Sequence, residues 1–439
     1  MTRNELSGDA RSRLDLVRRS RSASHPAGRF APGRFGLSPA RIGTVCMAAV
    51  LAVAPGAGAE PSPHPTGWVS SWATSPQPLA DPSLAFDNVT LRQIIHLTVG
   101  GRAVRLRLDN TFGDEAVTFA DVHVGVAGVD GAIRAGTDRA VRFGGDTAVT
   151  IAQGAQALSD PVELTVPAEA DLAISIYLPG AALATGHHNA GQSSFVSTTG
   201  DHAADMSGAA YTPRLSDWFW LGGADVLDRS AAGLVVTLGD SITNGAFAPF
   251  NQNGRWPDVL ARRLLALRHD RPRAVVNEGI DGNKLLLPRD CCGNSVPGLA
   301  RLDRDVILQA GVTHVLVLLG TNDIADNGNA DAFIAGYLQM AAQLHARGLA
   351  LVGGTIPPFG GFDNTPQHEI ERQKVNRWMR TTGILDGVVD FDRILRDPAA
   401  PAHMLPAFDS GDHLHPGPAG YQAMGNAIDL SLFQVRMER

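Results

Sequence analysis

The pattern of apolar residues changes near Ala231, and this change constrains the possible fold more strongly than any other feature of the chain. Between about residues 67 and 191, short runs alternate apolar and polar side chains, as in residues 104–108 (VRLRL), and Gly, Asp and Asn clusters separate the runs. Alternation with a period of two is typical of antiparallel strands that bury one face. Several such strands in succession predict an all-β, sandwich-like region.

The apolar runs beyond Ala231 no longer alternate, as in residues 315–319 (VLVLL), and helical patterns lie between them. Strands that are buried on both faces have this composition. About five repeats of strand and helix predict a three-layer α/β/α domain with a parallel sheet. The expected strands are residues 233–238, 274–277, 315–319, 349–352 and 388–391. The expected helices are residues 256–268, 299–310, 332–347, 369–381 and 418–430.

The first 59 residues have the composition of an export signal. Residues 1–41 hold nine arginines, an apolar stretch follows at residues 42–53, and Ala57-Gly58-Ala59 is a small-residue cleavage site. This pattern predicts a secretory signal that is removed after Ala59, so that the protein is extracellular or periplasmic. The apolar stretch is too short for a membrane span of about 20 residues. A disordered cytoplasmic tail is the alternative interpretation.

These patterns divide the chain into a signal peptide with a long basic region (1–59), a β-sandwich-like accessory domain with a linker (60–228) and an α/β domain (229–439). Beyond residue 59 the chain has 28 Lys and Arg against 41 Asp and Glu, a net charge of −13. An acidic exported chain is a poor candidate for binding nucleic acid or anionic membranes. Cys291 and Cys292 are adjacent and too close for an unstrained disulfide, so we expect free or loosely paired thiols.

Polar motifs follow three of the expected parallel strands, at the edge where such sheets bind ligands. Ser241 is placed there as a nucleophile. A glycine in the segment 277–283 would let a substrate oxygen approach the backbone N–H, and the side-chain amide of Asn322 is a second donor that can stabilise an oxyanion. Each motif taken singly is also compatible with an ordinary turn. The motifs are Gly-Asp-Ser at 239–241, a glycine-containing segment at 277–283 and Gly-Thr-Asn-Asp at 320–323.

A fourth motif, Asp412-His413-Leu414-His415, precedes the last expected helix. A carboxylate three residues before an imidazole can hold one ring nitrogen and leave the other free to take a proton from serine. His413 is the alternative base, but adjacent side chains diverge, so the spacing favours His415 over His413. A surface histidine pair is the alternative interpretation of this loop taken alone.

Together the four motifs resemble those of the SGNH (GDSL-like) hydrolase family, over about residues 231–437. One departure is that GDSI replaces the commoner GDSL. The resemblance implies a flavodoxin-like sheet and a triad of Ser241, His415 and Asp412. It also implies an oxyanion hole made by the Ser241 N–H, the Gly282 N–H and the Asn322 side chain, with no cofactor. No G-x-S-x-G motif occurs, which argues against an α/β-hydrolase.

The expected reaction is hydrolysis of carboxylic esters through an acyl-enzyme, with a small-molecule or polysaccharide ester as substrate. Predicted secretion, acidity and the attached β-rich region favour acetyl esters of carbohydrates. The alternatives are an acyltransferase, a carbohydrate-binding protein with an inactive hydrolase domain, and a lipase or lysophospholipase. The lipase needs an exposed apolar groove, for which the candidates are Phe247, Phe250, residues 285–287 and Phe359. An equal alternative is that these side chains pack in the core.

The histidines and tryptophans of the β-rich region have two possible roles. His187, His188 and His202 lack metal-binding spacing with a carboxylate partner, so we expect no metal site. Tryptophans can stack on sugar rings, but they more often fill a core or a domain boundary. The latter is favoured for Trp218 and Trp220, which lie just before the α/β domain; the other two candidates are Trp68 and Trp72.

Overall fold

A computed structural model describes residues 67–78, 84–267, 271–289, 295–362 and 364–434. By its internal contacts the chain divides into Met1–Ala59 and Glu60–Arg439, and all described residues belong to the second unit. The predicted signal peptide and Cys291-Cys292 lie outside the described residues. The predicted division into 60–228 and 229–439 remains a prediction. Within this unit, the described residues between 67 and 227 form a β-rich region, and those between 233 and 434 form an α/β region.

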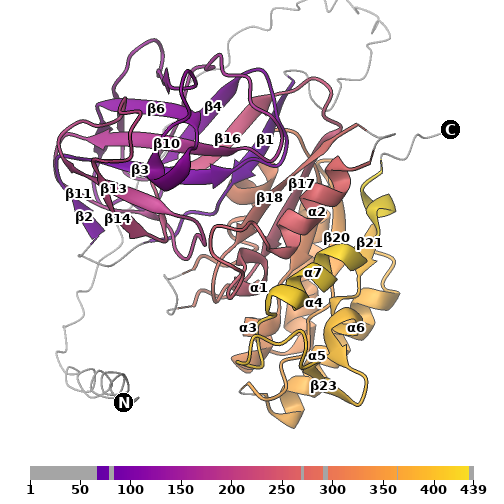
Figure 1. Ribbon diagram of the computed structural model, residues 1–439. Coiled ribbons are helices and arrows are strands. Elements are labelled where there is room, and N and C mark those ends of the chain that lie inside the picture. Colours follow the sequence, from indigo (N-terminus) through magenta and orange to yellow (C-terminus); the bar gives the residue numbers. More distant parts are fainter. Residues whose placement is uncertain (1–66, 79–83, 268–270, 290–294, 363, 435–439) are drawn as a thin grey trace, which may run out of the picture. The chain divides into compact units, whose positions relative to one another are not determined.

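The β-rich region consists mainly of two antiparallel sheets (Figure 1). Burial follows the alternation of the sequence, since Val104, Leu106 and Leu108 of β4 are buried while Arg105 and Arg107 are half-buried. The first sheet has the order β1 (Trp68–Ala73), β16 (Leu221–Leu227), β4 (Val104–Asp109), β9 (Gln156–Leu158). The second has the order β14 (Tyr211–Leu215), β13 (Ser194–Thr199), β3 (Val89–His96), β10 (Asp171–Leu178), β6 (Asp121–Val126), β7 (Arg139–Ala140).

Short strand pairs complete this region, and side chains from both sheets share one hydrophobic core. The predicted antiparallel, sandwich-like architecture is therefore confirmed. The pairs are β2 (Ala85–Phe86) with β11 (Ala182–Leu183), β5 (Val117–Phe119) with β8 (Val149–Ile151), and β12 (Gly186–His187) with β15 (Trp218–Phe219).

Five parallel strands form the sheet of the α/β region, in the order β18-β17-β19-β20-β21. All seven residues of β17 are buried, as expected for a strand that is covered on both faces. This flavodoxin-like order reverses direction between β17 and β19, the point at which such sheets bind ligands. The predicted fold class is confirmed. The strands are β17 (Gly233–Gly239), β18 (Arg273–Gly279), β19 (Val312–Leu318), β20 (Ala350–Gly354) and β21 (Gly387–Val389).

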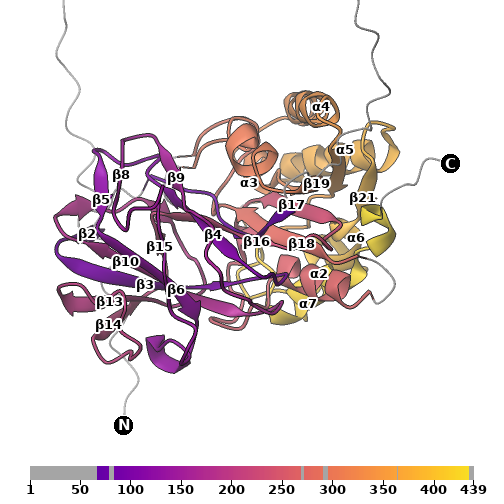
Figure 2. The ribbon, with the colours of Figure 1, turned by 90° about the horizontal axis from the view of Figure 1, so that it is seen from above.

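Helices cover both faces of this sheet (Figure 2). Val235 of β17 packs in one cluster with α2 (Trp256–Leu265), α6 (Phe391–Leu395) and α7 (Pro418–Ala427). Its neighbours Leu234 and Val236 pack in another with α4 (Ala330–His345) and α5 (Pro366–Thr381). The remaining elements are the short helices α1 (Ser241–Asn244) and α3 (Thr321–Ala325), a hairpin of β22 (Arg396–Asp397) and β23 (Ala400–Met404), and 3-10 turns at Val129–Gly131 and Leu430–Phe433.

Several predicted elements were too long; the helices expected at residues 256–268 and 418–430, for example, end at Leu265 and Ala427. Two others show the physical reason. Of the helix expected at residues 299–310, only a widened turn, Asp303–Ile307, is regular, and Gly311 with φ 83° ends the segment. The strand expected at residues 388–391 ends at Val389, because the side chain of Asp390 accepts a hydrogen bond from the Arg393 N–H and so caps α6.

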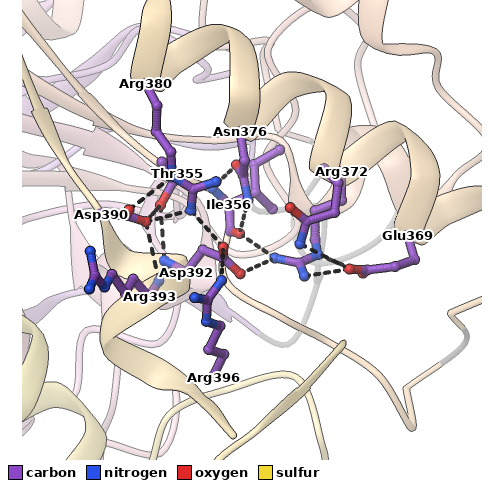
Figure 3. A network of polar contacts seen from close by, with 11 residues as sticks. Thr355, Ile356, Glu369, Arg372, Asn376, Arg380, Asp390, Asp392, Arg393 and Arg396 are labelled. Atoms are coloured by element: carbon purple, nitrogen blue, oxygen red, sulfur yellow. Dashed lines mark hydrogen bonds and ion pairs between the residues drawn. The ribbon is translucent and has the colours of Figure 1, made fainter. Parts of the chain in front are cut away.

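A buried ion-pair network fixes the chain just after β20 (Figure 3). The fully buried Arg372 of α5 donates to Asp392 (2.6 Å) and to the carbonyl of Ile356 (2.9 Å). Asp392 also accepts from Arg380 (2.6 Å), and the Asn376 amide bonds both backbone groups of Ile356. Because an unpaired buried charge is costly, these mutual contacts hold α5, α6 and the end of β20 in one arrangement.

The β-rich region covers the outer edge of the parallel sheet. Strand β1 packs against the edge strand β18. The Thr98 hydroxyl donates to the carbonyl of Val275 in β18 (3.0 Å), and the Val275 N–H donates back to it (3.2 Å). Exposed edge strands carry unpaired N–H and C=O groups, and here part of that hydrogen-bonding capacity is met by the β-rich region. Within the described residues, no helix is both long and apolar enough to cross a membrane.

Candidate active site

The chain turns sharply from β17 into α1, and Ser241 lies at this turn. Strand β17 ends at Gly239 and α1 begins at Ser241. Asp240 caps the helix, since its Oδ1 accepts a hydrogen bond from the Ile242 N–H (3.0 Å). A Cβ at position 239 would lie 2.0 Å from the Thr243 hydroxyl, so only glycine fits there. The serine is thus presented at the carboxyl end of a central strand.

Ser241, His415 and Asp412 are joined by hydrogen bonds. Ser241 Oγ lies 2.8 Å from His415 Nε2, and His415 Nδ1 lies 2.6 Å from Asp412 Oδ2. Ser241 is 174 residues from His415 in the chain, whereas Asp412 and His415 belong to the same loop. His413, the alternative base, is 57% exposed and contacts Asp409 (2.7 Å) instead. The arrangement can pass a proton from the hydroxyl to the imidazole, with the carboxylate orienting the ring.

The loop around Asp412 holds its carboxylate in the ionised form. Asp412 Oδ1 accepts from the N–H groups of Leu414 (3.0 Å) and His415 (2.8 Å) and from the Ser410 hydroxyl (2.9 Å). Burial by itself raises the pKa of Asp412, but the hydrogen bonds from His415 and the backbone outweigh it and lower the pKa to about 2. The carboxylate is therefore negative at neutral pH and can stabilise an imidazolium.

Gly282 lies in the loop after β18 and Asn322 in the first turn of α3, and the two segments are tied to each other and to β17. The Asn322 amide donates to the carbonyl of Asn283 (3.0 Å), the residue after Gly282, and accepts from the Arg289 guanidinium. The Ile280 N–H donates to the carbonyl of Gly239 at the end of β17 (3.1 Å). Gly282 has φ 72°, a conformation that favours glycine. These contacts bring the predicted donors to the edge where Ser241 lies.

Several carboxylates at this edge were not singled out from the sequence. Both oxygens of Asp323 accept from the Leu285 N–H (3.0 Å), which fixes the loop after β18. Burial raises the pKa of Asp323 to about 6 and, together with the nearby Asp323 and Asp281, raises that of Asp240 to about 7. An acidic residue directly before a helix is a capping signal, and sequence reasoning could have used it for Asp240, which precedes α1.

Replacing Asp240 by Asn tests whether the raised pKa of this buried carboxyl lowers the stability of the protein. A carboxyl whose pKa is raised in the folded state binds its proton more tightly than in the unfolded chain, so it lowers stability as pH rises from about 4 to about 7. Its Oδ2 has no hydrogen-bond partner among the described residues, so ionisation is not compensated there. Asn keeps the capping oxygen and cannot ionise. We expect the stability of Asp240→Asn relative to the wild type to increase between pH 5 and pH 8, by up to about 2.5 kcal/mol.

Melting temperatures of the two proteins at pH 5, 6, 7 and 8 measure this difference. Asp323 and the other carboxyl groups with a raised pKa are present in both proteins, so their contributions to the pH dependence of stability largely cancel. Parallel pH curves for variant and wild type would show that Asp240 keeps an ordinary pKa.

The candidate apolar groove is only partly exposed. Phe247, Phe250 and Leu287 are exposed, at 58%, 47% and 63%, and the Phe247 ring lies 5.5 Å from the His415 imidazole. Leu285 and Phe359 are buried and belong to the hydrophobic core cluster, so for these two the alternative role in packing holds. Three apolar side chains therefore remain on the surface of the loops at this edge.

The tryptophans pack inside the protein. Trp72, Trp218 and Trp220 are buried, and the rings of Trp72 and Trp218 meet edge to face at 4.9 Å. The prediction that they fill the core or a boundary is confirmed for these three. The half-buried Trp68 instead lies under the Arg105 guanidinium, 4.6 Å from the ring centre. Among the residues described, no group of three or more His, Cys, Asp or Glu could hold a metal ion.

The α/β region matches the model of a known protein family. The model of the GDSL-like Lipase/Acylhydrolase family matches residues 237–423, a span that includes Ser241, Gly282, Asn322, Asp412 and His415. The chain is similar to the solved structure of an aryl esterase from M. smegmatis, at 17% identity over 47% of this chain and 99% of the other, with a TM-score of 0.37. None of the curated proteins compared with the chain matches it.

Two further solved structures are similar at the same level. One is an acetylxylan esterase from Geobacillus stearothermophilus, at 21% identity over 45% of this chain and 93% of the other, with a TM-score of 0.34. The other is a carbohydrate acetylesterase family member from Sinorhizobium meliloti, at 19% identity over 44% and 94%, with a TM-score of 0.36.

Proposed function

Residues 237–423 form a GDSL-like lipase/acylhydrolase (SGNH) domain, and from this premise we propose that the protein is a serine esterase with Ser241 as nucleophile. The observation that supports the proposal most directly is the hydrogen-bonded sequence Ser241–His415–Asp412, with distances of 2.8 and 2.6 Å. A hydroxyl in contact with an imidazole that a carboxylate orients is the arrangement that activates serine for acyl transfer.

The mechanism follows from these contacts. His415 Nε2 takes the proton of Ser241 as Oγ attacks the ester carbonyl, and Asp412 stabilises the imidazolium. The N–H groups of Ser241 and Gly282 and the amide of Asn322 donate to the tetrahedral oxyanion. His415 then protonates the leaving alkoxide, and water repeats both steps on the acyl-enzyme. A sugar hydroxyl in place of water would make the protein an acyltransferase.

Removing the Asn322 amide tests the oxyanion hole. We expect Asn322→Ala to lose roughly 100-fold or more in kcat, because one lost oxyanion donor typically costs about 3–4 kcal/mol of barrier. Steady-state hydrolysis of p-nitrophenyl acetate measures the loss, and a melting curve checks that the variant is folded. A matched control is Asn329→Ala, which removes an exposed helix-capping amide of α4. A kcat within threefold of the wild type would remove Asn322 from the oxyanion hole.

For the substrate, we propose short-acyl esters of carbohydrates outside the cell. The predicted export signal and the net charge of −13 beyond residue 59 support an extracellular, non-membrane substrate. Because residues 1–59 lie outside the described residues, export remains a proposal, and the N-terminal residue of the secreted protein tests it. The exposed Phe247, Phe250 and Leu287 favour a second candidate, an esterase or lipase for more apolar acyl groups.

One experiment separates these candidates. The purified protein is given p-nitrophenyl acetate, butyrate and octanoate, acetylated xylan, and a lysophospholipid, while mass spectrometry follows acylation of Ser241. Activity that falls steeply from acetyl to octanoyl, together with release of acetate from xylan, supports the carbohydrate substrate. The reverse order supports the lipase. Sugar binding without any ester cleavage would leave a carbohydrate-binding protein with an inactive domain and refute the esterase proposal.

A further inference from the structure

A histidine of the β-rich region contacts the helix that begins with Ser241. His187 lies in β12 and is buried, with 1% of its surface exposed. Its Nδ1 lies 2.9 Å from the carbonyl oxygen of Ser75, and its Nε2 lies 3.0 Å from Oδ1 of Asn244. Asn244 is the last residue of α1 and Ser241 is the first. Hydrogen bonds therefore join the β-rich region to the four-residue helix that carries the proposed nucleophile, since the Asn244 amide also donates to the carbonyl of Asn189 (3.4 Å).

The contacts continue to the loop that carries Gly282. The Asn244 amide donates to Asp281 Oδ1 (2.8 Å), and Asp281 is the residue before Gly282. The other carboxylate oxygen, Oδ2, accepts from the amide of Asn189 (2.7 Å), which also belongs to the β-rich region. His187 and Asn189 thus hold α1 and the Gly282 loop together from one side. Two of the three proposed oxyanion donors, the N–H groups of Ser241 and Gly282, lie on these two segments.

The two oxygen atoms that face the ring of His187 bear on which of its nitrogens carries a proton. The Ser75 carbonyl can only accept, so Nδ1 carries a proton. The Asn244 oxygen also accepts, because the Asn244 NH₂ group faces the Asp281 carboxylate. Nε2 faces this oxygen at hydrogen-bond distance and donates to it when both ring nitrogens carry a proton. Burial, together with the Arg255 guanidinium, lowers the pKa of His187, against the smaller opposing contributions of the hydrogen bonds to Ser75 and Asn244 and of the Asp281 carboxylate.

We propose that His187 is a positioning residue for ester hydrolysis, which fixes the distance between α1 and the Gly282 loop through Asn244 and Asp281. The inference rests on the proposed esterase function and deepens it, since it gives the β-rich region a part in the reaction. Misplacing reacting groups by about 1 Å can cost 100-fold in rate. The contact with Asn244, rather than the burial of an imidazole, is what the reaction needs.

Two substitutions at this position separate positioning from packing. In His187→Gln the terminal amide can occupy the place of Nε2 and donate to Asn244, whereas in His187→Asn the shorter amide can occupy the place of Nδ1 and donate only to Ser75. Each variant loses one buried hydrogen bond, so similar losses of stability are expected. We expect His187→Asn to lose about 10- to 100-fold in kcat for p-nitrophenyl acetate with KM within threefold, and His187→Gln to stay within about threefold.

Controls keep the test decisive. His188→Asn changes the adjacent, half-buried histidine and should have wild-type kinetics. If His187→Asn does not fold, the exposed Asn189 gives a milder test, since Asn189→Ala removes a donor to Asp281 and should lower kcat about 3- to 10-fold without changing KM. Equal kcat losses in the Asn and Gln variants, or none in His187→Asn and Asn189→Ala, would overturn the proposal. A wild-type protein that hydrolyses no ester would instead refute the esterase function itself.

Discussion

Ser241→Ala is expected to lose at least about 10⁴-fold in kcat for p-nitrophenyl acetate, because loss of the nucleophile in serine hydrolases removes up to about 10⁶-fold. Its Oγ is the only atom of the side chain in contact with His415 Nε2 (2.8 Å), and alanine leaves the imidazole without a hydroxyl to activate. The variant should fold, since the change removes one hydroxyl at a site where Asp240 still caps α1. Mass spectrometry should find no acyl group at position 241.

The matched control is Ser230→Ala, an identical change at an exposed serine outside the site. It should have wild-type kinetics. A purified Ser241→Ala protein that still cleaves the ester at a tenth or more of the wild-type rate would rule out Ser241 as the nucleophile, provided that trace wild-type enzyme is excluded by active-site titration.

Asp412→Asn is expected to lose about 10³- to 10⁴-fold in kcat with little change in fold. Oδ1 of Asp412 accepts from the N–H groups of Leu414 and His415, so the oxygen of an asparagine has to stay at that position. Its NH₂ group then faces His415 Nδ1, where the carboxylate now lies at 2.6 Å. Nδ1 becomes the acceptor and the proton moves to Nε2, which can no longer take the proton of Ser241.

The neighbouring pair supplies the control for this substitution. Asp409 contacts His413 (2.7 Å) much as Asp412 contacts His415, but the imidazole of His413 is exposed. Asp409→Asn should therefore keep kcat within about threefold, and raising the pH should not restore Asp412→Asn, because the tautomer rather than the charge is wrong. A large loss in Asp409→Asn and a small one in Asp412→Asn would point to His413 as the base.

The sequence predicted the fold class and the residues that meet at the carboxyl edge, because both depend on local patterns. A strand such as β17 is continuously apolar where it is covered on both faces, and the polar residue that follows it must lie at the edge. The contact of Ser241 with His415, which lies in the loop before α7, was implied by the resemblance to the family motifs and not by the strands alone.

What the sequence could not predict depends on packing between distant segments. Nothing in the residues around His187 indicates that its ring meets Asn244, 57 residues later in the chain. Likewise, Phe359 and Phe247 have the same side chain and both follow strands of the parallel sheet, yet one is in the core and the other is 58% exposed. Hydrophobicity alone does not distinguish a loop residue that folds back from one that points outward.

The contact of Thr98 with Val275 has a consequence for how this protein can be divided. A fragment that starts at residue 229 would contain every member of the triad, but β18 would become an exposed edge strand. Such an edge can pair with a strand of another copy. Such a fragment would be prone to self-association before its chemistry could be measured. The β-rich and α/β regions should therefore be expressed and engineered together, because residues of the β-rich region cover the edge strand of the parallel sheet.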